Sequence, residues 1–263
     1  MKRFEDKVVI VTGAGTGIGA GTARRFLQEG ASVVLNGRRE QKLHETLAGF
    51  DAAKSLVHPG DVTDEAYVKR LVEDTVAHFG KLDVLVNNAA MSVFGPFEQI
   101  TTQDWRKLMA TDLDSVFFGA REALPHLLKT RGSLINLSSV SGLGGDWGLS
   151  SYNAAKGAVT NFTRALALEY GSRGVRVNAV APTFTSTEHT AEFQKIEAVM
   201  AAFRDRLPIG RAATPDEIAG VIAFLASEDA RFVNGVILPV DGGLHASNGQ
   251  PNFLALLGQI GQS

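Results

Sequence analysis

The chain has 263 residues, which is long enough to bury a large core without disulfides or metal ions. Hydrophobic residues make up 44% of it and charged residues 21%, values typical of globular proteins, and this excludes disordered and fibrous classes. The 26 basic and 28 acidic residues are interspersed, so nothing indicates a nucleic-acid or anionic-membrane partner. Cysteine is absent, which excludes disulfides, thiolate metal sites and a cysteine nucleophile.

We expect no export signal at the start of the chain. Residues 1–7 are polar and lead directly into an apolar strand, and no apolar run approaches membrane-spanning length. The absence of cysteine suits a reducing compartment. We therefore expect a cytoplasmic protein.

Short β-branched segments alternate with longer helical patterns along the chain, which is typical of βαβ units around a parallel sheet. The strands are predicted at residues 7–12, 32–36, 55–58, 83–87, 133–138, 175–180 and 236–240. The helices are predicted at residues 17–29, 39–48, 64–79, 102–130, 151–171 and 215–225. The strands are nearly continuous apolar runs, as expected when helices cover both faces of a sheet. Because no linker or repeat interrupts the pattern, we expect one α/β domain over residues 1–263.

Three segments that follow strands lack clean periodicity, namely residues 91–100, 140–150 and 181–209. Ligands of open parallel sheets bind at the loops after the strands' carboxyl ends, so residues 181–209 are the expected substrate loop. The tail, 242–263, contains an apolar run at 253–257. We expect that run to form a subunit contact, because a monomer has little reason to expose it.

A glycine-rich segment, residues 12–19, joins the first strand to the first helix. Glycines there let the backbone turn tightly and bring helix N–H groups against a pyrophosphate. The alternative is a tight strand–helix turn without a ligand, but the position inside a βαβ unit favours a dinucleotide site. The candidate cofactor residues are Gly13, Gly15, Thr16, Gly17, Ile18 and Gly19.

The end of the second strand indicates which dinucleotide binds. An NAD site usually has an acidic residue there, whereas this strand continues into Arg38 and Arg39. Two guanidiniums without a carboxylate would attract a 2′-phosphate. The arginines could also be a solvated helix start, but NADP(H) is the predicted cofactor, preferred over NAD.

Ser139, Tyr152 and Lys156 form a second candidate group. Tyr152 and Lys156 are four residues apart and share one helix face. A free phenol has a pKa of about 10, and we expect the lysine charge to lower that pKa towards a working range. Ser139, at the end of the fifth strand, could hold a substrate oxygen. Tyr-x-x-x-Lys spacing is common, so on spacing alone a packed tyrosine and a solvated lysine remain the alternative.

Several motifs in chain order together resemble the short-chain dehydrogenase/reductase family, in its single-domain branch, over essentially the whole chain. They lie at residues 12–19, 61–62, 87–90, 136–139, 152–156, 176–178 and 241–243. The resemblance implies a Rossmann-type, doubly wound, seven-stranded parallel sheet with helices on both faces. It also implies hydride transfer between a nicotinamide cofactor and a carbonyl or secondary alcohol, in a homodimer or homotetramer.

The resemblance also implies individual roles. Tyr152 would be the general acid/base, Ser139 would orient the substrate, and Lys156 would contact the cofactor ribose and tune Tyr152, which itself also lies against the cofactor. The implied contacts elsewhere along the cofactor are Asp61 and Val62 at the adenine, Asn87, Asn88 and Ala89 in the cleft, and Pro182, Thr185 and Thr187 towards the nicotinamide.

The sequence departs from the family pattern at three places. Asp112 replaces the asparagine that completes the family's catalytic tetrad, and we expect its carboxylate to pair with Lys156 and weaken the pull of that lysine on Tyr152. Thr183 replaces the glycine of a Pro-Gly pair, and a β-branched residue resists positive φ, so this loop is expected to run differently. Ala90 replaces a glycine beside the cofactor and narrows that space.

Residues 140–148 and 241–251 are similar to those of bacterial meso-2,3-butanediol dehydrogenases, also called acetoin or diacetyl reductases. That similarity implies a small hydroxyketone or vicinal diol as substrate. The candidate substrate residues, besides Ser139, are Met91, Phe94, Trp147, Phe184 and His189, each of which could equally be ordinary loop packing.

Other functions remain open. A 3-oxoacyl-[acyl-carrier-protein] reductase would share the fold and triad but needs a basic docking face that the balanced charge does not indicate, and a sugar-alcohol dehydrogenase is a further alternative. A non-catalytic cofactor-sensing scaffold would tolerate loss of the triad, yet Ser139, Tyr152 and Lys156 are all present. The six histidines are scattered without ligand spacing, so no metal site is predicted.

Overall fold

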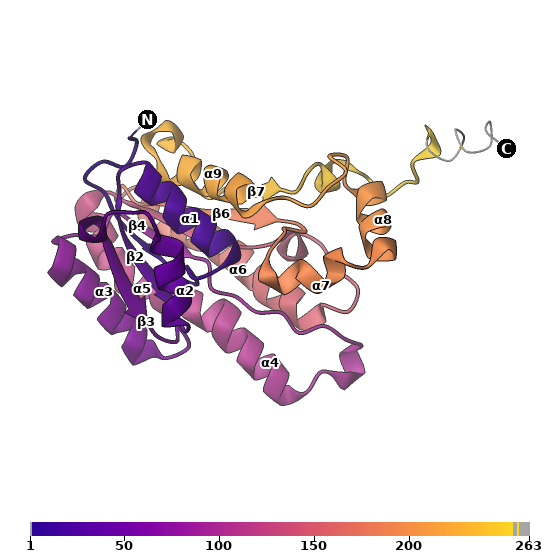
Figure 1. Cartoon of the computed structure of the whole chain (residues 1–263), viewed down its shortest axis with the longest axis horizontal. Helices are drawn as coiled ribbons and strands as arrows, with labels where there is room; N and C mark the ends of the chain where they lie inside the picture. Colours follow the sequence, from indigo (N-terminus) through magenta and orange to yellow (C-terminus); the bar gives the residue numbers. More distant parts are fainter. Residues whose placement is uncertain (1, 255–256, 258–263) are drawn as a thin grey trace.

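A seven-stranded parallel sheet forms the centre of the protein (Figure 1). The computed structural model describes residues 2–254 and 257. The strands are β1 (Val8–Val11), β2 (Ser32–Gly37), β3 (Ser55–Pro59), β4 (Val84–Asn87), β5 (Ser133–Leu137), β6 (Arg176–Pro182) and β7 (Ile237–Val240). Their order is β3-β2-β1-β4-β5-β6-β7, and every neighbouring pair is parallel. The predicted fold is confirmed. The order in which the chain adds strands to the sheet reverses between β1 and β4, and open parallel sheets bind ligands at such a point.

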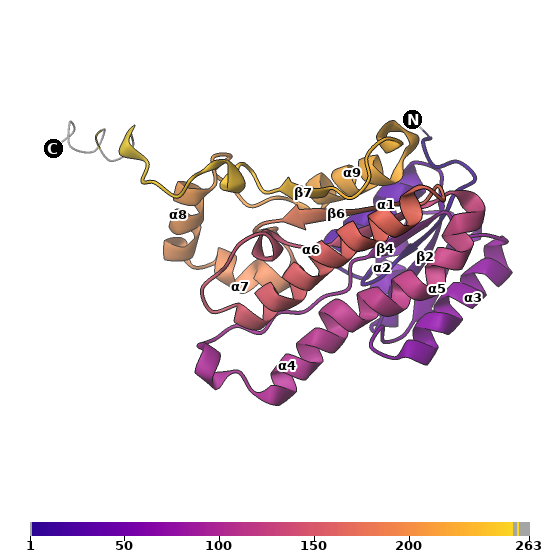
Figure 2. The same ribbon diagram turned by 180° about the vertical axis from the view of Figure 1, so that it is seen from behind.

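Helices cover both faces of the sheet (Figures 1 and 2). The strands have apolar side chains on both faces, and each face needs a cover. In β1, for example, Val9 and Val11 belong to one core and Ile10 belongs to the other. The first core is closed by α1 (Gly17–Gln28), α2 (Glu40–Leu47) and α9 (Pro215–Ala226). The second is closed by α3 (Glu65–Phe79), α5 (Ser115–Thr130) and α6 (Ser150–Gly171). Among the described residues, no helix is long and apolar enough to cross a membrane.

Capping residues set the helix boundaries that position the loops. The Asp64 carboxylate accepts hydrogen bonds from the first backbone N–H groups of α3, which ends at Gly80 with φ of 81°. Thr214 and Glu217 form a reciprocal capping box at the start of α9, with Pro215 in the first turn. These local signals explain why the predicted helix boundaries agree with the structure to within one or two residues.

The predicted helix at 102–130 is divided into three parts. It consists of α4 (Thr102–Met109), a π-helical turn (Ala110–Asp114) and α5. A π-helical turn inserts extra backbone into a helix and is frequent at functional sites. Here it carries Asp112, whose side chain is fully buried.

The predicted substrate loop, 181–209, contains two helices that the sequence pattern did not reveal. They are α7 (Ala191–Gln194) and α8 (Glu197–Arg206), and neither has a buried residue. Without a buried face they have no apolar periodicity to detect. In Figures 1 and 2 they project from the sheet beside the tail.

The apolar run of the tail is described only in part. Phe253, Leu254 and Leu257 are exposed, while residues 255 and 256 lie outside the described residues. The expected subunit contact therefore stays a prediction.

Candidate active site

The glycine-rich loop after β1 is held in place by the loop after β4. The Thr12 hydroxyl accepts hydrogen bonds from the backbone N–H groups of Asn88 and Ala89, at 2.9 and 3.0 Å. The Asn88 side-chain amide donates to the Thr12 and Gly13 carbonyls at 2.8 and 3.3 Å. The motif around Asn88 therefore stabilises the conformation of the glycine-rich loop. Thr12 was not singled out, although it opens the glycine motif.

Glycine is required in this loop because backbone approaches backbone closely. Gly13 has φ of 66°, and a Cβ added at Gly19 would lie 2.2 Å from the Gly13 carbonyl oxygen. Asn87 lies behind them and donates its side-chain amide to Asn136 at 3.0 Å. Ile18, in the first turn of α1, packs against the core and so fixes the direction of the helix.

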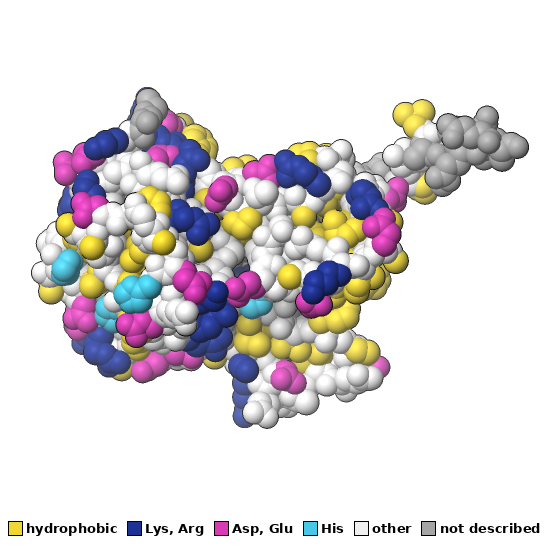
Figure 3. Space-filling view, viewed as in Figure 1, with side chains coloured by type: hydrophobic (Ala, Val, Ile, Leu, Met, Phe, Trp, Pro, Cys, Tyr) yellow, Lys and Arg dark blue, Asp and Glu magenta, His cyan; other side chains and the backbone are white. Residues whose placement is uncertain are grey.

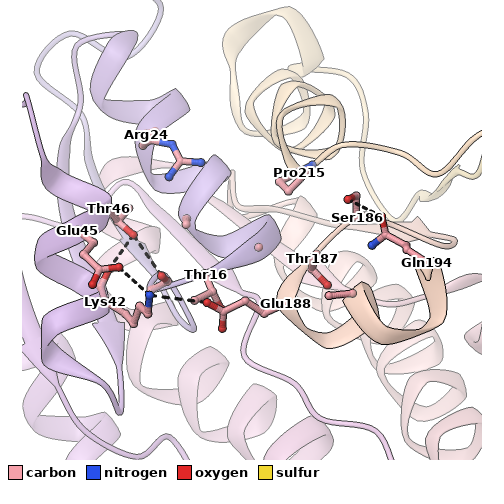
Figure 4. Close-up of a pocket in the computed structure, with 14 residues that line it drawn as sticks. Thr16, Arg24, Lys42, Glu45, Thr46, Ser186, Thr187, Glu188, Gln194 and Pro215 are labelled. Atoms are coloured by element: carbon pink, nitrogen blue, oxygen red, sulfur yellow. Dashed lines mark hydrogen bonds and ion pairs between the residues drawn. The ribbon is translucent and has the colours of Figure 1, made fainter.

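A cavity of about 590 Å³ opens at the amino end of α1 (Figure 4). Gly15, Thr16 and Gly17 line one side of it, and Ser186–Glu188 lie across from them. The first turn of α1 contains no acidic residue, and the Thr16 side chain does not cap it. Its backbone N–H groups and positive dipole end therefore suit an anion, so the residues present fit the diphosphate of a dinucleotide.

Two arginines follow β2, in different surroundings. Arg39 donates to the Glu188 carboxylate at 3.0 Å, and Lys42 lies 3.8 Å from the same carboxylate. Within the described part of the chain, Arg38 is exposed and makes no hydrogen bond or ion pair. Of the two guanidiniums, the one of Arg38 is not paired with a described carboxylate.

The expected adenine contacts lie after β3. Asp61 is exposed, and its carboxylate accepts hydrogen bonds from the Thr63 backbone N–H and hydroxyl, both at 2.9 Å. Val62 is buried in the core that α3 closes. The carboxylate is thus held by its own turn and faces solvent.

Ser139, Tyr152 and Lys156 meet where β5 ends and α6 begins. The Lys156 ammonium lies 5.5 Å from the centre of the Tyr152 ring and donates to the Leu137 carbonyl at 3.0 Å. It is 2% exposed and forms an ion pair with Asp112 at 3.2 Å. The expected pairing of Asp112 with Lys156 is confirmed. The other Asp112 oxygen accepts a hydrogen bond from the Met91 backbone N–H at 2.8 Å.

The expected lowering of the Tyr152 pKa is not what the structure gives. Burial raises the pKa of the Tyr152 phenol, and the carboxylates of Asp112 and Asp146 raise it further. Lys156 and Ser139 oppose this rise but do not overcome it. The correction has a physical reason, since sequence spacing shows the lysine charge but not the desolvation of the phenol. A raised pKa keeps the phenol protonated and able to donate a proton.

The buried pair itself is also perturbed. Burial raises the pKa of the Asp112 carboxyl against the opposing charge of Lys156. Burial alone would lower the pKa of the Lys156 ammonium, but the Asp112 carboxylate outweighs it and the pKa rises. Lys156 is therefore held as a cation next to Tyr152.

We expect the substitution Asp112→Asn to move the acidic limb of the pH–rate profile for alcohol oxidation to lower pH. The asparagine removes a negative charge that raises the pKa of Tyr152, and the deprotonated phenol is the form that accepts a proton. Initial rates of oxidation across a pH series measure the shift. Asp146→Asn is the matched control, and it should give a smaller shift in the same direction because Asp146 is the weaker influence. An unchanged profile in Asp112→Asn would contradict this account.

Ser139 connects Tyr152 to a polar chain that the sequence analysis missed. The Ser139 hydroxyl contacts the Ser141 hydroxyl at 3.2 Å and the Pro182 carbonyl at 3.4 Å. The Ser141 hydroxyl in turn donates to the Asp146 carboxylate, which is exposed. The only signal in the sequence was the presence of polar residues inside the aperiodic segment 140–150.

The loop after β6 packs against the glycine-rich loop. A Cβ at Gly17 would lie 3.0 Å from the Thr187 methyl group. Thr185 is buried and its hydroxyl donates to the Thr183 carbonyl at 2.9 Å. Thr183 does not adopt positive φ, so the backbone here takes the course that its β-branched side chain allows. The loop thereby closes one side of the cavity.

The candidate substrate residues fall into three groups. Phe94 makes an edge-to-face contact with Phe193 of α7, and Phe184 stacks on Phe203 of α8 at 4.2 Å. Trp147 is 91% exposed and His189 is exposed, and no described contact joins either to Ser139 or Tyr152. Met91 reaches the site through its backbone bond to Asp112.

Two further features concern possible partners. Within residues 2–254 and 257, no three His, Cys, Asp or Glu side chains lie close enough to hold a metal ion. On the face shown in Figure 3, Lys and Arg side chains are interspersed with Asp and Glu and do not form one basic area.

The chain is similar to known dehydrogenases and reductases over nearly its whole length. A family model described as enoyl-(acyl carrier protein) reductase matches residues 13–245. The chain is 45% identical to a meso-2,3-butanediol dehydrogenase of Serratia marcescens, over 96% of this chain and 100% of the relative. It is 43% identical to a cis-4-hydroxycyclohexanecarboxylate dehydrogenase of Sinomonas cyclohexanicum, over 92% and 98%. It is 38% identical to an NADP-dependent (R)-specific alcohol dehydrogenase of Lentilactobacillus kefiri, over 93% and 98%.

Proposed function

The chain belongs to the short-chain dehydrogenase/reductase family, and we propose that it transfers a hydride between NADP(H) and a small hydroxyketone or vicinal diol. Its relatives are oxidoreductases named for diol and alcohol substrates, and the chain is an NAD(P)-dependent oxidoreductase that acts on CH–OH groups. The observation that carries the proposed hydride transfer is the cluster of Ser139, Tyr152 and Lys156 at the start of α6.

The proposed chemistry follows from this cluster. When bound, the nicotinamide cofactor supplies or accepts the hydride. In reduction, the Tyr152 hydroxyl, which its raised pKa keeps protonated, donates a proton to the carbonyl oxygen. Ser139 holds that oxygen in place, and Lys156 stabilises the phenolate that remains. The ion pair with Asp112 keeps Lys156 charged and in position.

A substrate with two adjacent oxygens suits the polar chain beside Tyr152. Ser139 can hold the reacting oxygen, while Ser141 and Asp146 offer hydrogen-bond acceptors for a neighbouring hydroxyl. The aromatic side chains of the loops would enclose the carbon atoms. The name of the Serratia relative also supports a vicinal diol.

A substrate panel tests this assignment. We expect kcat/KM for acetoin to exceed that for butanone by about tenfold, because butanone lacks the hydroxyl that Ser141 and Asp146 would hold. A sugar and an acetoacetyl thioester serve as the controls for the sugar and acyl-carrier functions. A preference for the thioester or the sugar would replace the proposed substrate class.

The proposed preference for NADP(H) rests on Arg38. Among the described residues, its guanidinium is the one directly after β2 that has no partner, and a 2′-phosphate would lie there. We also propose a dimer or tetramer in which the exposed Phe253, Leu254 and Leu257 contact another subunit. Light scattering of the chain truncated after Gly243 measures that contribution.

A further inference from the structure

Glu188 lines the cofactor cavity and contacts two basic residues on its other side, Arg39 and Lys42. Its carboxylate pairs with Arg39 at 3.0 Å and lies 3.8 Å from the Lys42 ammonium. Arg39 and Lys42 stand at the start of α2, whereas Glu188 comes from the loop after β6. Figure 4 shows Glu188 pointing from its loop towards Lys42 across the space beside Thr16.

This placement makes Glu188 a competitor for an incoming phosphate. A 2′-phosphate near the end of β2 would seek the guanidiniums of Arg38 and Arg39, but Arg39 already has a carboxylate partner. The phosphate would have to take Arg39 from Glu188 and would also meet a like charge there. A ribose 2′-hydroxyl carries no charge and meets neither penalty.

We propose that Glu188 is a cofactor-specificity residue that lowers the affinity for a phosphorylated ribose by occupying Arg39. The inference rests on the proposed dinucleotide site. It gives Arg38 and Glu188 opposite effects on the affinity for a 2′-phosphate. Arg38 attracts the 2′-phosphate, and Glu188 limits how much Arg39 adds to that attraction. The chain therefore discriminates between NADP(H) and NAD(H) less than its two arginines would suggest.

The other charged residues around Glu188 are not expected to control 2′-phosphate binding in the same way. Lys42 is already paired with Glu45 at 2.7 Å, so its charge is largely compensated. Arg24 also lines the cavity, and its ion pair is with Asp216 of α9 at 4.0 Å. Among the described residues, Glu188 is the only carboxylate paired with Arg39.

The test compares cofactor affinities of the wild type and Glu188→Gln at fixed ionic strength. Glutamine keeps the size of the side chain and removes its charge. We expect the Kd for NADP+ to fall about fivefold while the Kd for NAD+ changes by less than about twofold. Quenching of tryptophan fluorescence by either cofactor reports the binding directly.

Two controls identify the cause. Glu192→Gln removes the same charge four residues further along, in α7, but Glu192 pairs with Lys195 and not with Arg39, so neither Kd should change. In an Arg39→Ala background, Glu188→Gln should lose most of its effect, because the arginine that it releases is gone.

Equal changes in both Kd values would overturn the proposal, because they would show that Glu188 only holds the loop in place. A fivefold gain that persists without Arg39 would overturn it as well. The wild-type preference is a separate outcome. If the wild type favours NAD+, the proposed NADP(H) preference fails, while a selective gain for NADP+ in Glu188→Gln would still support the role of Glu188.

Discussion

Replacing Tyr152 by phenylalanine is expected to lower kcat about 1,000-fold, the largest effect of any single substitution considered. The phenylalanine ring fills the same space at the start of α6 but has no proton to give or take. Cofactor affinity should change by less than about tenfold, since the residues that line the cofactor cavity do not include Tyr152. Steady-state rates of acetoin reduction, together with a cofactor titration, separate the two effects.

Tyr170→Phe is the matched control for that substitution. It makes the same chemical change on the same helix, but Tyr170 packs against the core near the end of α6 and contacts Arg173. Its kcat should equal that of the wild type. If both tyrosine variants lose activity equally, the loss comes from the helix and not from the Tyr152 hydroxyl.

The second large effect is expected from Arg38→Ala, which should raise the Kd for NADP+ about 10- to 100-fold. Arg38 has no competing partner among residues 2–254 and 257, so its hydrogen-bonding capacity is available to a phosphate. The Kd for NAD+ should stay within about twofold, because no phosphate contact is lost. Fluorescence titrations with the two cofactors measure both values.

Arg39→Ala supplies the comparison for Arg38→Ala. Arg39 is already bound to Glu188, so its removal should weaken NADP+ binding only about threefold. A loss of NAD+ affinity equal to the loss of NADP+ affinity in Arg38→Ala would mean that Arg38 supports the loop and does not recognise the 2′-phosphate.

The sequence predicted the sheet well because its signals are local. The inner strands are buried apolar runs, the edge strands β3 and β7 are partly buried, and the helix starts carry recognisable caps, as at Asp64 and Thr214. The pairing of Asp112 with Lys156 was also predicted, because the family resemblance placed both residues at one site.

The features that the sequence did not reveal depend on long-range packing. Arg39 and Glu188 are separated by 149 residues, and no local pattern joins them. The pKa of Tyr152 was misjudged because desolvation depends on the surrounding walls, which spacing along one helix does not describe. The helices α7 and α8 were missed because they bury no side chain.

The most direct test of the whole account is a single-turnover experiment with NADPH and diacetyl, following the loss of reduced-nicotinamide absorbance in wild type and Tyr152→Phe. We predict that the wild type oxidises one NADPH per bound diacetyl in a fast phase, and that the variant binds NADPH yet shows no such phase. Equal fast phases in both proteins would contradict the assignment of Tyr152. A wild type that reduces diacetyl with NADH but not with NADPH would contradict the proposed cofactor.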